Sequence, residues 1–590
     1  MTKAVGGRKV MSVVSQFSPV PFEDQPILDF YNPEAAAFQS QLGEYVPRRI
    51  ETLMEQAAAG SGKKPFLTTA LPNGASATLT FAEVDRHSAN LARYLREELK
   101  LQKGDVVALQ APNCISNVLA MLGVLRAGLV LTNINPLYTA HETRRQLRDA
   151  EVKVLITSSL FPDVAEEAVV GTGIVSVISL SLTDFFSPLK KTVMDFVLQH
   201  VKKMGRPLKI HNVPMADALK RGAAHDTPMS LYAKDRDANE DAIFQYSGGT
   251  TGISKGVRLT EAGVVTNVEQ FASLSPHMID APSQTMLLVL PVYHVFGLFS
   301  SIIALRNAAH LVLVPSPKPL SNLKAAFRKF RPNAFPGVST LFAKLMDEAW
   351  FYENPPQLTL TISGAMGLNP EVRKQWIGLT GSSVIEGYGM TETTTLISVN
   401  PPDARTRAGS VGMPLPGTAV SILRDDGSFA GPGETGEIVV AGPQVMAGYL
   451  GRPETTAAAF HVGWMKTGDV GYLDDDGFLY LVDRIKDMLL VGGFNVFPNE
   501  VDAVLATHPG IAEAAVAGVP DGNMGDTMHA FIVRGDPDLT AAEVMAHCAS
   551  CLTAYKRPRK VHFVDELPKS PIGKVVRREL RAQVKAAAGD

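Results

Sequence analysis

Apolar stretches of strand length alternate with helical stretches through the first two thirds of this chain, and that alternation limits the available folds more than any other feature. Stretches such as Asp105–Gln110 are apolar almost throughout, as strands buried on both faces are. Strands that alternate with helices are typical of parallel βαβ units. The predicted strands are 105–110, 128–132, 152–157, 285–290 and 310–314, and the helices between the first three are 115–125 and 142–150. The sequence therefore predicts an α/β fold built on parallel sheets.

The sequence pattern changes after about residue 405. Short strands now alternate with Gly-Asp turns, which predicts a small β-rich subdomain. A chain of 590 residues is too long to fold around a single hydrophobic core. We therefore expect a large N-terminal domain, 1–485, and a small α+β C-terminal domain, 486–590. The first 45 residues or so contain several prolines and are expected to be irregular. The C-terminal elements expected are strands at 514–519 and 528–533 and helices at 499–508 and 541–552.

The composition is that of an ordinary globular protein. A net charge of −3 gives no reason to expect a nucleic-acid partner. Three cysteines cannot build a disulfide framework and fit a reducing cytoplasm. Cys548 and Cys551 have zinc-like spacing but no second ligand pair nearby, so we expect an ordinary helix there. The N-terminus has no apolar run of signal-peptide length, and the apolar stretch 285–305 is interrupted by Pro291 and His294, so a cytoplasmic location is expected.

The segment 189–209 stands apart from this background. Leu189, Val193 and Phe196 recur at helical spacing within it. The basic residues that surround them are Lys190, Lys191, Lys202, Lys203, Arg206 and Lys209. A basic amphipathic helix can lie on an anionic membrane, and the same pattern is also typical of a solvated surface helix. The sequence leaves both interpretations open, and our hypothesis is weak peripheral contact with the inner face of the membrane.

A glycine-rich stretch, Tyr246–Gly256, carries the strongest functional signal. It places four glycines and four serine or threonine hydroxyls around Lys255. Glycines let a backbone approach a ligand closely, and N–H groups, hydroxyls and a lysine are partners for a polyphosphate. The Walker pattern fails, because no serine or threonine follows the lysine. Residues 252–256 also fit the G-x-S-x-G elbow of serine hydrolases, so a remote hydrolase alternative has Ser254 as its nucleophile.

Four further motifs follow this loop along the chain. They are Glu386-Gly-Tyr-Gly-Met-Thr-Glu392, Thr467-Gly-Asp469, 483–500 and Pro568–Arg577. The ordered set of five resembles the superfamily of acyl-CoA synthetases, adenylation domains and firefly luciferase, over nearly the whole chain from about residue 45. Segments 133–139, 291–297 and 492–501 are most similar to bacterial long-chain fatty acid–CoA ligases.

The resemblance implies a ligase that uses ATP, Mg²⁺ and coenzyme A in two steps. A fatty acid carboxylate attacks the α-phosphate of MgATP to give acyl-adenylate and pyrophosphate, and the CoA thiol then takes the acyl group and releases AMP. Lys574 resembles the lysine that bridges the carboxylate and the α-phosphate. Thr391 resembles a contact of the AMP phosphate, and Glu392 resembles a Mg²⁺ ligand. The residues that resemble the family's nucleotide contacts are Ser247, Gly248, Gly249, Thr250, Thr251, Gly252, Lys255, Gly256, Gly364, Ala365, Glu386, Gly387, Tyr388, Asp469 and Arg484.

The resemblance also implies where the other substrates bind and what moves. His294 stands where amino-acid-activating relatives carry an aspartate, so an uncharged acyl chain is expected; a core histidine would look the same in sequence. Gly492, Gly493 and Phe494 resemble the surface that faces the pantetheine of CoA. Lys486 lies where the family hinges its C-terminal domain, which rotates between the two half-reactions.

Some features leave alternatives open. Ala365, Met366 and Glu261 depart from the family pattern, so the width of the acyl tunnel and the chain length of the acid are not determined. A fatty acyl-AMP ligase or an aryl-CoA ligase would carry the same motifs. Outside this class stand the serine hydrolase and a catalytically silent binding protein. The sequence is also compatible with a homodimer.

Overall fold

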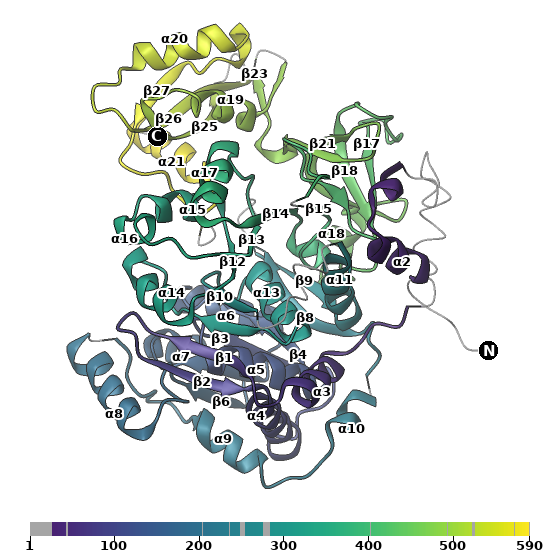
Figure 1. The fold of residues 1–590 in the computed structure, drawn as a ribbon, viewed down its shortest axis with the longest axis vertical. Coiled ribbons are helices and arrows are strands. Elements are labelled where there is room, and N and C mark those ends of the chain that lie inside the picture. Colours follow the sequence, from purple (N-terminus) through teal and green to yellow (C-terminus); the bar gives the residue numbers. More distant parts are fainter. Residues whose placement is uncertain are drawn as a thin grey trace.

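Two large sheets, each built mainly of parallel strands, form the body of the molecule (Figure 1). A small antiparallel sheet and a C-terminal α+β domain lie at one end of them. The α/β class, the β-rich subdomain and the small C-terminal domain are therefore confirmed. The computed structural model describes residues 26–42, 45–202, 204–234, 236–247, 254–274, 284–401, 403–491, 494–521, 525–570 and 573–588.

The first large sheet has nine strands, of which the six central ones run parallel. In spatial order the strands are β16 (Met413–Pro414), β15 (Ser398–Asn400), β14 (Ser383–Tyr388), β13 (Leu360–Ser363), β12 (Ala334–Gly337), β10 (Thr285–Leu288), β11 (His310–Leu313), β1 (Pro65–Ala70) and β2 (Ser76–Thr80). The carboxyl ends of β12, β13 and β14 lie side by side. Such a row of strand ends is where open α/β sheets bind ligands.

The second large sheet has eight strands, and several strands that are neighbours in the sheet are not consecutive in the sequence. In spatial order they are β19 (Gly448–Tyr449), β9 (Lys255–Thr260), β8 (Asp241–Ser247), β4 (Val130–Asn133), β3 (Val106–Gln110), β5 (Val154–Ser158), β6 (Ser176–Leu180) and β7 (Val213–Pro214). Strands β9 and β19 pair antiparallel at one edge, and the other strands are parallel. The predicted strands at 105–110 and 152–157 are confirmed as β3 and β5.

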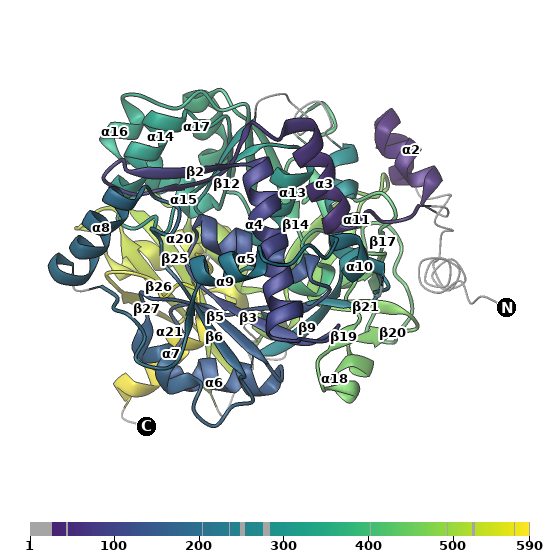
Figure 2. The ribbon, with the colours of Figure 1, turned by 90° about the horizontal axis from the view of Figure 1, so that it is seen from below.

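Helices between the two sheets share one hydrophobic core with both of them (Figure 2). Buried residues such as Leu288 of β10, Leu131 of β4 and Ile302 of α13 belong to this single cluster. The helices of the two-sheet body are α3 (Ile50–Ser61), α4 (Phe81–Arg93), α5 (Ile115–Arg126), α6 (Ala140–Asp149), α7 (Pro162–Ala168), α8 (Pro188–Phe196), α9 (Met215–Gly222), α10 (Met229–Lys234), α11 (Glu261–Leu274), α13 (Val295–Arg306), α14 (Lys324–Phe330), α15 (Ser339–Met346), α16 (Ala349–Tyr352) and α17 (Pro370–Thr380).

Side-chain caps set where several of these helices begin. Thr80 and Glu83 form a reciprocal capping box at the start of α4, and Thr139 and Glu142 do the same for α6. The apolar stretch 285–305 is strand β10, a polar turn and the buried helix α13, as the interrupting residues predict. Among the described residues, no helix has both the length and the apolar character needed to cross a membrane.

The prediction of an irregular start is wrong for residues 33–41, which form helix α2 (Pro33–Gln41). Asn32 caps it by accepting a hydrogen bond from the backbone N–H of Ala35 at 2.7 Å, and Pro33 occupies the first helical position, where a missing N–H costs nothing. Gln39 of helix α2 accepts a hydrogen bond from the backbone N–H of Gly417, just before the small antiparallel sheet, although nearly four hundred residues separate them (Figure 1). The strands of that sheet are β17 (Ala419–Leu423), β18 (Gly436–Ala441), β20 (Phe460–His461), β21 (Trp464–Leu473) and β22 (Leu479–Arg484), and helix α18 (Pro453–Ala458) adjoins it.

The C-terminal domain packs against the first large sheet near the ends of β12 to β14 (Figure 1). Lys344 on α15 lies 3.7 Å from a carboxylate oxygen of Glu513 on β25, and Gly573 fits against Thr340 at the start of α15. Its elements are β23 (Leu489–Val491), β24 (Phe494–Val496), α19 (Pro498–Leu505), β25 (Ile511–Asp521), β26 (Gly525–Arg534), α20 (Ala541–Cys551), β27 (Lys560–Phe563) and α21 (Arg577–Ala588). The helices and strands predicted for the C-terminal domain are thereby confirmed, with ends shifted by a few residues. Cys548 and Cys551 lie on helix α20, as expected.

Glu261, one of the departures from the family pattern, has a structural role. One of its carboxylate oxygens accepts a hydrogen bond from the backbone N–H of Ile50 at 2.8 Å, and the other lies 3.9 Å from the guanidinium of Arg49. Glu261 begins α11 and Ile50 begins α3. A buried glutamate therefore joins the starts of two helices.

Candidate functional site

The glycine-rich stretch is the loop of a β-hairpin. Strands β8 and β9 pair antiparallel, with Ser247 opposite Lys255, and the hydroxyl of Ser254 donates to the carbonyl of Ser247 at 2.7 Å. The predicted phosphate contacts inside the loop, Gly248, Gly249, Thr250, Thr251 and Gly252, lie outside the described residues. A nucleophile elbow requires a strand followed by a helix. Because Ser254 instead precedes a strand, the hydrolase alternative lacks its structural context.

The base of the hairpin is held from two sides. The hydroxyl of Tyr246 donates to Asp149 at the end of α6, at 2.6 Å. A Cβ on Gly256 would lie 3.1 Å from the ring of Tyr246, so the glycine lets that ring lie against the strand. The ends of β8 and β9 that flank the glycine-rich loop are therefore held in place.

The ends of β13 and β14 form the next part of the site. Gly364 follows β13, and a Cβ there would lie 3.1 Å from the ring of Phe296. Ala365 has a left-handed backbone, with φ +67°, a conformation that costs a non-glycine residue roughly 1–2 kcal/mol. On β14, a carboxylate oxygen of Glu386 accepts the backbone N–H of Leu368 at 2.8 Å, and burial raises the pKa of Glu386.

A buried aspartate joins the first sheet to the small antiparallel sheet. The hydroxyl of Tyr388, at the end of β14, donates to Asp469 on β21 at 2.7 Å. The guanidinium of Arg484 on β22 lies 3.0 Å from the other oxygen of Asp469. Burial and the carboxylate of Asp469 raise the pKa of Tyr388, so its proton stays on the hydroxyl. Three of the predicted nucleotide contacts are therefore joined through Asp469. Gly387 lies beside them, where a Cβ would come 2.7 Å from Leu396.

Thr391 and Glu392 lie on a single 3-10 turn, Thr391–Thr393, that follows β14. The buried carboxylate of Glu392 accepts a hydrogen bond from the hydroxyl of Tyr449 at 3.1 Å. The ammonium of Lys255 lies 4.9 Å from the centre of the Tyr449 ring. Glu392 and Lys255, far apart in sequence, therefore meet at one tyrosine.

Lys574 reaches this site from the C-terminal domain. It ends a tight turn in which Ser570 donates its backbone N–H to the carbonyl of Lys574 at 2.8 Å, and Gly573 has φ +81°. Burial, and then the positive charge of Arg484, lower the pKa of Lys574 to about 8, while Asp469 opposes that shift. Lys574 therefore lies within electrostatic reach of the Asp469–Arg484 pair.

His294 lies close enough to feel the charge of Lys574. It caps α13, where its Nδ1 accepts the backbone N–H of Phe296 at 3.3 Å. Burial, and then the charge of Lys574, lower the pKa of His294 to about 4. The imidazole is therefore neutral at physiological pH, and the site offers no carboxylate at this position.

The predicted hinge lies between β22 and β23. Lys486 is the middle residue of the 3-10 turn Ile485–Asp487, and burial and Arg484 lower its pKa. Asp483, just before the turn, accepts hydrogen bonds from the backbone N–H and side-chain amide of Asn499 on α19, at 2.7 and 2.9 Å. Gly492 and Gly493 lie outside the described residues, and Phe494 begins β24.

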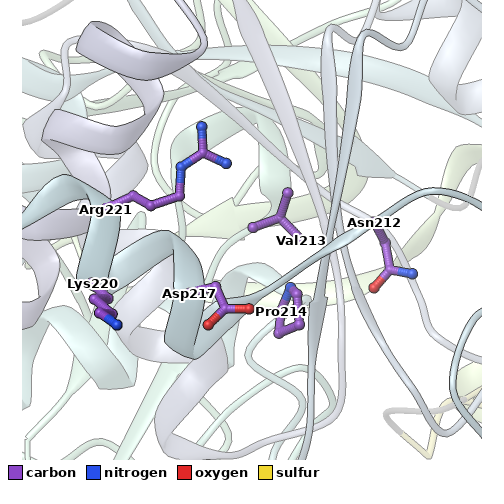
Figure 3. A pocket seen from close by; sticks show the side chains of 6 residues that line it. All are labelled: Asn212, Val213, Pro214, Asp217, Lys220 and Arg221. Carbon is purple, nitrogen blue, oxygen red and sulfur yellow. The ribbon is translucent and has the colours of Figure 1, made fainter.

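The structure thus brings together residues from the predicted motifs that lie as much as three hundred residues apart. One contributor was missed by the sequence reasoning: Tyr449, which belongs to no recognised motif and contacts Glu392 only through the fold. A surface hollow of about 520 Å³ lies elsewhere (Figure 3). It is lined by residues of β7 and α9, at the opposite edge of the sheet from the β8–β9 hairpin, and includes no predicted site residue.

Comparison with known proteins agrees with this geometry. The profile of the family described as AMP-binding enzyme matches residues 54–450, and that of the AMP-binding enzyme C-terminal domain matches residues 500–574. A long-chain-fatty-acid–CoA ligase of Escherichia coli O6:H1 is 37% identical over 92% of this chain and 96% of its own. A ligase of the same name from Haemophilus influenzae is 40% identical over 85% and 90%. The structure of o-succinylbenzoate CoA synthetase from Bacillus subtilis with ATP and magnesium aligns with a TM-score of 0.71 at 26% identity, covering 91% of this chain and 100% of that one.

Proposed function

The chain belongs to the AMP-binding enzyme family, and we propose that it is a fatty acid–CoA ligase that forms acyl-adenylate from a fatty acid and ATP and then acyl-CoA. Both relatives above are named long-chain-fatty-acid–CoA ligase, and each similarity covers most of this chain and of the relative. The observation that supports the proposal best is the position of Lys574: its neighbour Gly573 packs against Thr340 at the start of α15, and its charge acts on the pKa of His294. The products of the full reaction are acyl-CoA, AMP and pyrophosphate.

The nucleoside end of ATP is assigned to Asp469 and its partners. Each carboxylate oxygen can accept two hydrogen bonds, and the partners of Asp469, Tyr388 and Arg484, leave capacity for ribose hydroxyls. Glu386, Gly387, Gly364 and Ala365 would line the adenine side, where the glycines leave room for a flat base. Thr391 would contact the α-phosphate, and the hairpin from Ser247 to Gly256 would hold the β- and γ-phosphates with Lys255 as counter-charge.

Lys574 addresses the main electrostatic problem of the first step. Both the attacking carboxylate and the α-phosphate are anions, and they repel each other as they approach. A buried ammonium between them offsets the charge that gathers there, and its effect is larger where water is excluded. The carboxylate oxygen attacks phosphorus, the bond from phosphorus to the bridging oxygen breaks, and pyrophosphate carries away the electron pair.

The residues present fit a magnesium ion that arrives with the nucleotide. Glu392 is a carboxylate next to Thr391, and magnesium prefers one or two carboxylates plus phosphate oxygens. Among the described residues there is no cluster of three or more histidine, cysteine or acidic side chains that would hold a metal by itself. We assign Glu392 as the protein ligand, and the bound ion would offset charge on the leaving pyrophosphate.

The acid that best fits the site is uncharged beyond its carboxylate. His294 carries no negative charge to pair with an ammonium group, and its Nδ1 already accepts the backbone N–H of Phe296. Half-buried Ala365, Met366 and Met390 pack on the main hydrophobic core near the strand ends. An apolar chain can bury its surface against such side chains, which supports a fatty acid over an amino acid.

The experiment that tests this function measures AMP formation with acids from acetate to stearate, and with benzoate and coumarate, each with and without CoA. We expect ATP- and acid-dependent pyrophosphate release with long-chain acids, and AMP release that requires CoA. Maximal CoA-dependent turnover on benzoate or coumarate would replace the fatty acid with an aryl acid. Adenylate that accumulates and is not transferred to CoA would indicate a fatty acyl-AMP ligase.

The second half-reaction requires that Lys574 withdraw. We propose that residues 486–590 rotate about Lys486 as one domain relative to 1–485, as the family pattern implies. The turn Ile485–Asp487 joins two sheets that share no strand, which suits a hinge. Gly492, Gly493 and Phe494 follow strand β23 and would then face the pantetheine of CoA.

We also propose weak contact with an anionic membrane through α8 and the turn that follows it, Val197–Val201. No described side chain of α8 is buried, and the exposed fractions are 78% for Leu189 and 59% for Phe196. The segment lies at the opposite end of the molecule from the C-terminal domain (Figure 1). Exposed apolar side chains rimmed by lysines are typical of an interfacial helix. A cytoplasmic location and a homodimer remain predictions; light scattering tests the latter.

Charge reversal in this segment is expected to weaken binding to anionic vesicles about 30-fold. Lys191 pairs with Asp184 and Asp195, so its reversal would also disturb the fold. We therefore choose Lys190→Glu with Lys202→Glu, which removes about 2 kcal/mol of attraction at roughly 1 kcal/mol per lysine. Flotation with phosphatidylserine vesicles measures the loss. The control carries Lys374→Glu and Lys560→Glu, an equal charge change on α17 and β27. Equal flotation of the two double variants would contradict the proposal.

A further inference from the structure

Tyr449 lies between two groups to which the proposed function gives separate tasks. Its hydroxyl donates to the carboxylate of Glu392 at 3.1 Å, and the Lys255 ammonium lies over its ring, 4.9 Å from the centre. Among the described residues, Lys255 forms no ion pair with a carboxylate. A lysine over the face of a tyrosine ring is attracted to it by the ring's electron density. One side chain therefore contacts both the assigned magnesium ligand and the assigned phosphate counter-charge.

The backbone around Tyr449 fixes it to both neighbours. Strand β19 pairs antiparallel with β9, which places Tyr449 opposite Val257, two residues after Lys255. The carbonyl of Glu392 accepts the backbone N–H of Met446 at 2.8 Å. Gly448 has φ +137°, and a Cβ there would come 2.7 Å from the side chain of Thr456. The tyrosine thus stands in a short segment, 446–449, whose strand β19 pairs with β9 and whose Met446 is bonded to the Glu392 turn.

We propose that Tyr449 is a positioning residue for the triphosphate end of the site. Its hydroxyl occupies one carboxylate oxygen of Glu392, which would leave the other oxygen for a metal that accompanies ATP. Its ring holds the Lys255 ammonium at the base of the phosphate loop. This inference rests on the proposed function, because it presumes that Glu392 and Lys255 face magnesium and the outer phosphates.

The position predicts effects that depend on which part of the nucleotide is present. The outer phosphates and the metal take part in binding ATP and in the first half-reaction only. AMP binding and the transfer of a supplied acyl-adenylate to CoA involve neither. Loss of Tyr449 should therefore weaken the former and leave the latter unchanged, which a loss of packing alone would not do.

The test compares Tyr449→Phe and Tyr449→Leu by isothermal titration with the magnesium complex of α,β-methylene-ATP and with AMP. We expect Tyr449→Phe to bind the ATP analogue about tenfold more weakly, since a hydrogen bond to a charged group is lost. Tyr449→Leu, which also lacks the ring, should bind it more weakly still. Both should bind AMP like the wild type. In turnover, the KM for MgATP should rise while transfer from supplied acyl-adenylate is retained.

The matched control is Tyr232→Phe, on helix α10 and away from the site. It removes a tyrosine hydroxyl that donates to the carboxylate of Glu97 at 2.6 Å. It should bind both nucleotides normally. The proposal fails if Tyr449→Phe binds the ATP analogue like the wild type, or if AMP and the ATP analogue weaken equally. Failure of the proposed function would be seen separately, as a wild-type chain that releases no pyrophosphate with any acid.

Discussion

Replacement of Lys574 by alanine is expected to slow acyl-adenylate formation by about 10²–10³-fold, the effect of removing one well-placed group that stabilises charge in a transition state. Transfer of the acyl group from supplied acyl-adenylate to CoA should proceed at the wild-type rate, because the lysine has by then left the site. Pyrophosphate release measures the first step, and thioester formation from synthetic acyl-adenylate measures the second. Lys560→Ala, an exposed lysine of the same domain, is the control. Normal pyrophosphate release from Lys574→Ala would remove Lys574 from the mechanism.

The pH dependence of the first step provides a second measurement of the same role. The pKa of Lys574 is lowered to about 8 by burial and by Arg484, and only the protonated form carries the charge that the step requires. The kcat/KM for adenylation should therefore fall as the pH rises through about 8, since this ratio reports groups of the free enzyme. Lys574→Arg, whose guanidinium stays charged, should be slower but show no such fall.

Replacement of Lys486 by proline is expected to separate the two half-reactions in the opposite sense. Proline fixes φ near −65°, so the turn Ile485–Asp487 loses the dihedral freedom that a rotation would use. Adenylate formation should continue within a few-fold of the wild-type rate, because the structure already has Lys574 at the site. Thioester formation should fall by a factor of at least 10², by analogy with other displaced catalytic geometries.

The control for the hinge is Lys486→Ala, which removes the ammonium and keeps the dihedral freedom. It should form thioester far faster than Lys486→Pro. Single-turnover assays that follow adenylate and thioester separately distinguish the two variants. An unchanged overall rate for Lys486→Pro would show that the rotation does not pass through this residue.

Much of the fold was predictable because buried parallel strands have a strong local signature. Strands β3 and β5 are buried at every position and mostly apolar, and turn residues bound them. Helix α2 was missed because Pro33 was interpreted as a sign of irregular chain, whereas behind the Asn32 cap it begins a helix. A proline has opposite meanings at the first position of a helix and inside one, and only the cap distinguishes them.

The candidate site was predictable where its residues stand in ordered motifs, as Glu392, Asp469 and Lys574 do. Tyr449 could not be found in this way. Its hydrogen bond to Glu392 spans 57 positions and depends on β19 pairing with β9 at the edge of a sheet. Glu261 is similar, because its partner at the start of α3 is more than two hundred residues away. Contacts of this kind arise from tertiary structure, and no local spacing encodes them.

The hydrogen bonds between Asp483 and Asn499 affect which arrangement of the two domains is more populated. Asp483 precedes the hinge and Asn499 follows it, so rotation about Lys486 must break hydrogen bonds to a buried carboxylate. Each bond of this kind contributes about 1.5–3 kcal/mol, so even one of them corresponds to a population ratio of roughly 10 to 150 in favour of the arrangement seen here. In the absence of ligands the enzyme would therefore rest with its lysine inserted, primed for ATP and the acid. Formation of the acyl-adenylate consumes the carboxylate charge that Lys574 offsets, and the arriving CoA then has only this modest bias to overcome.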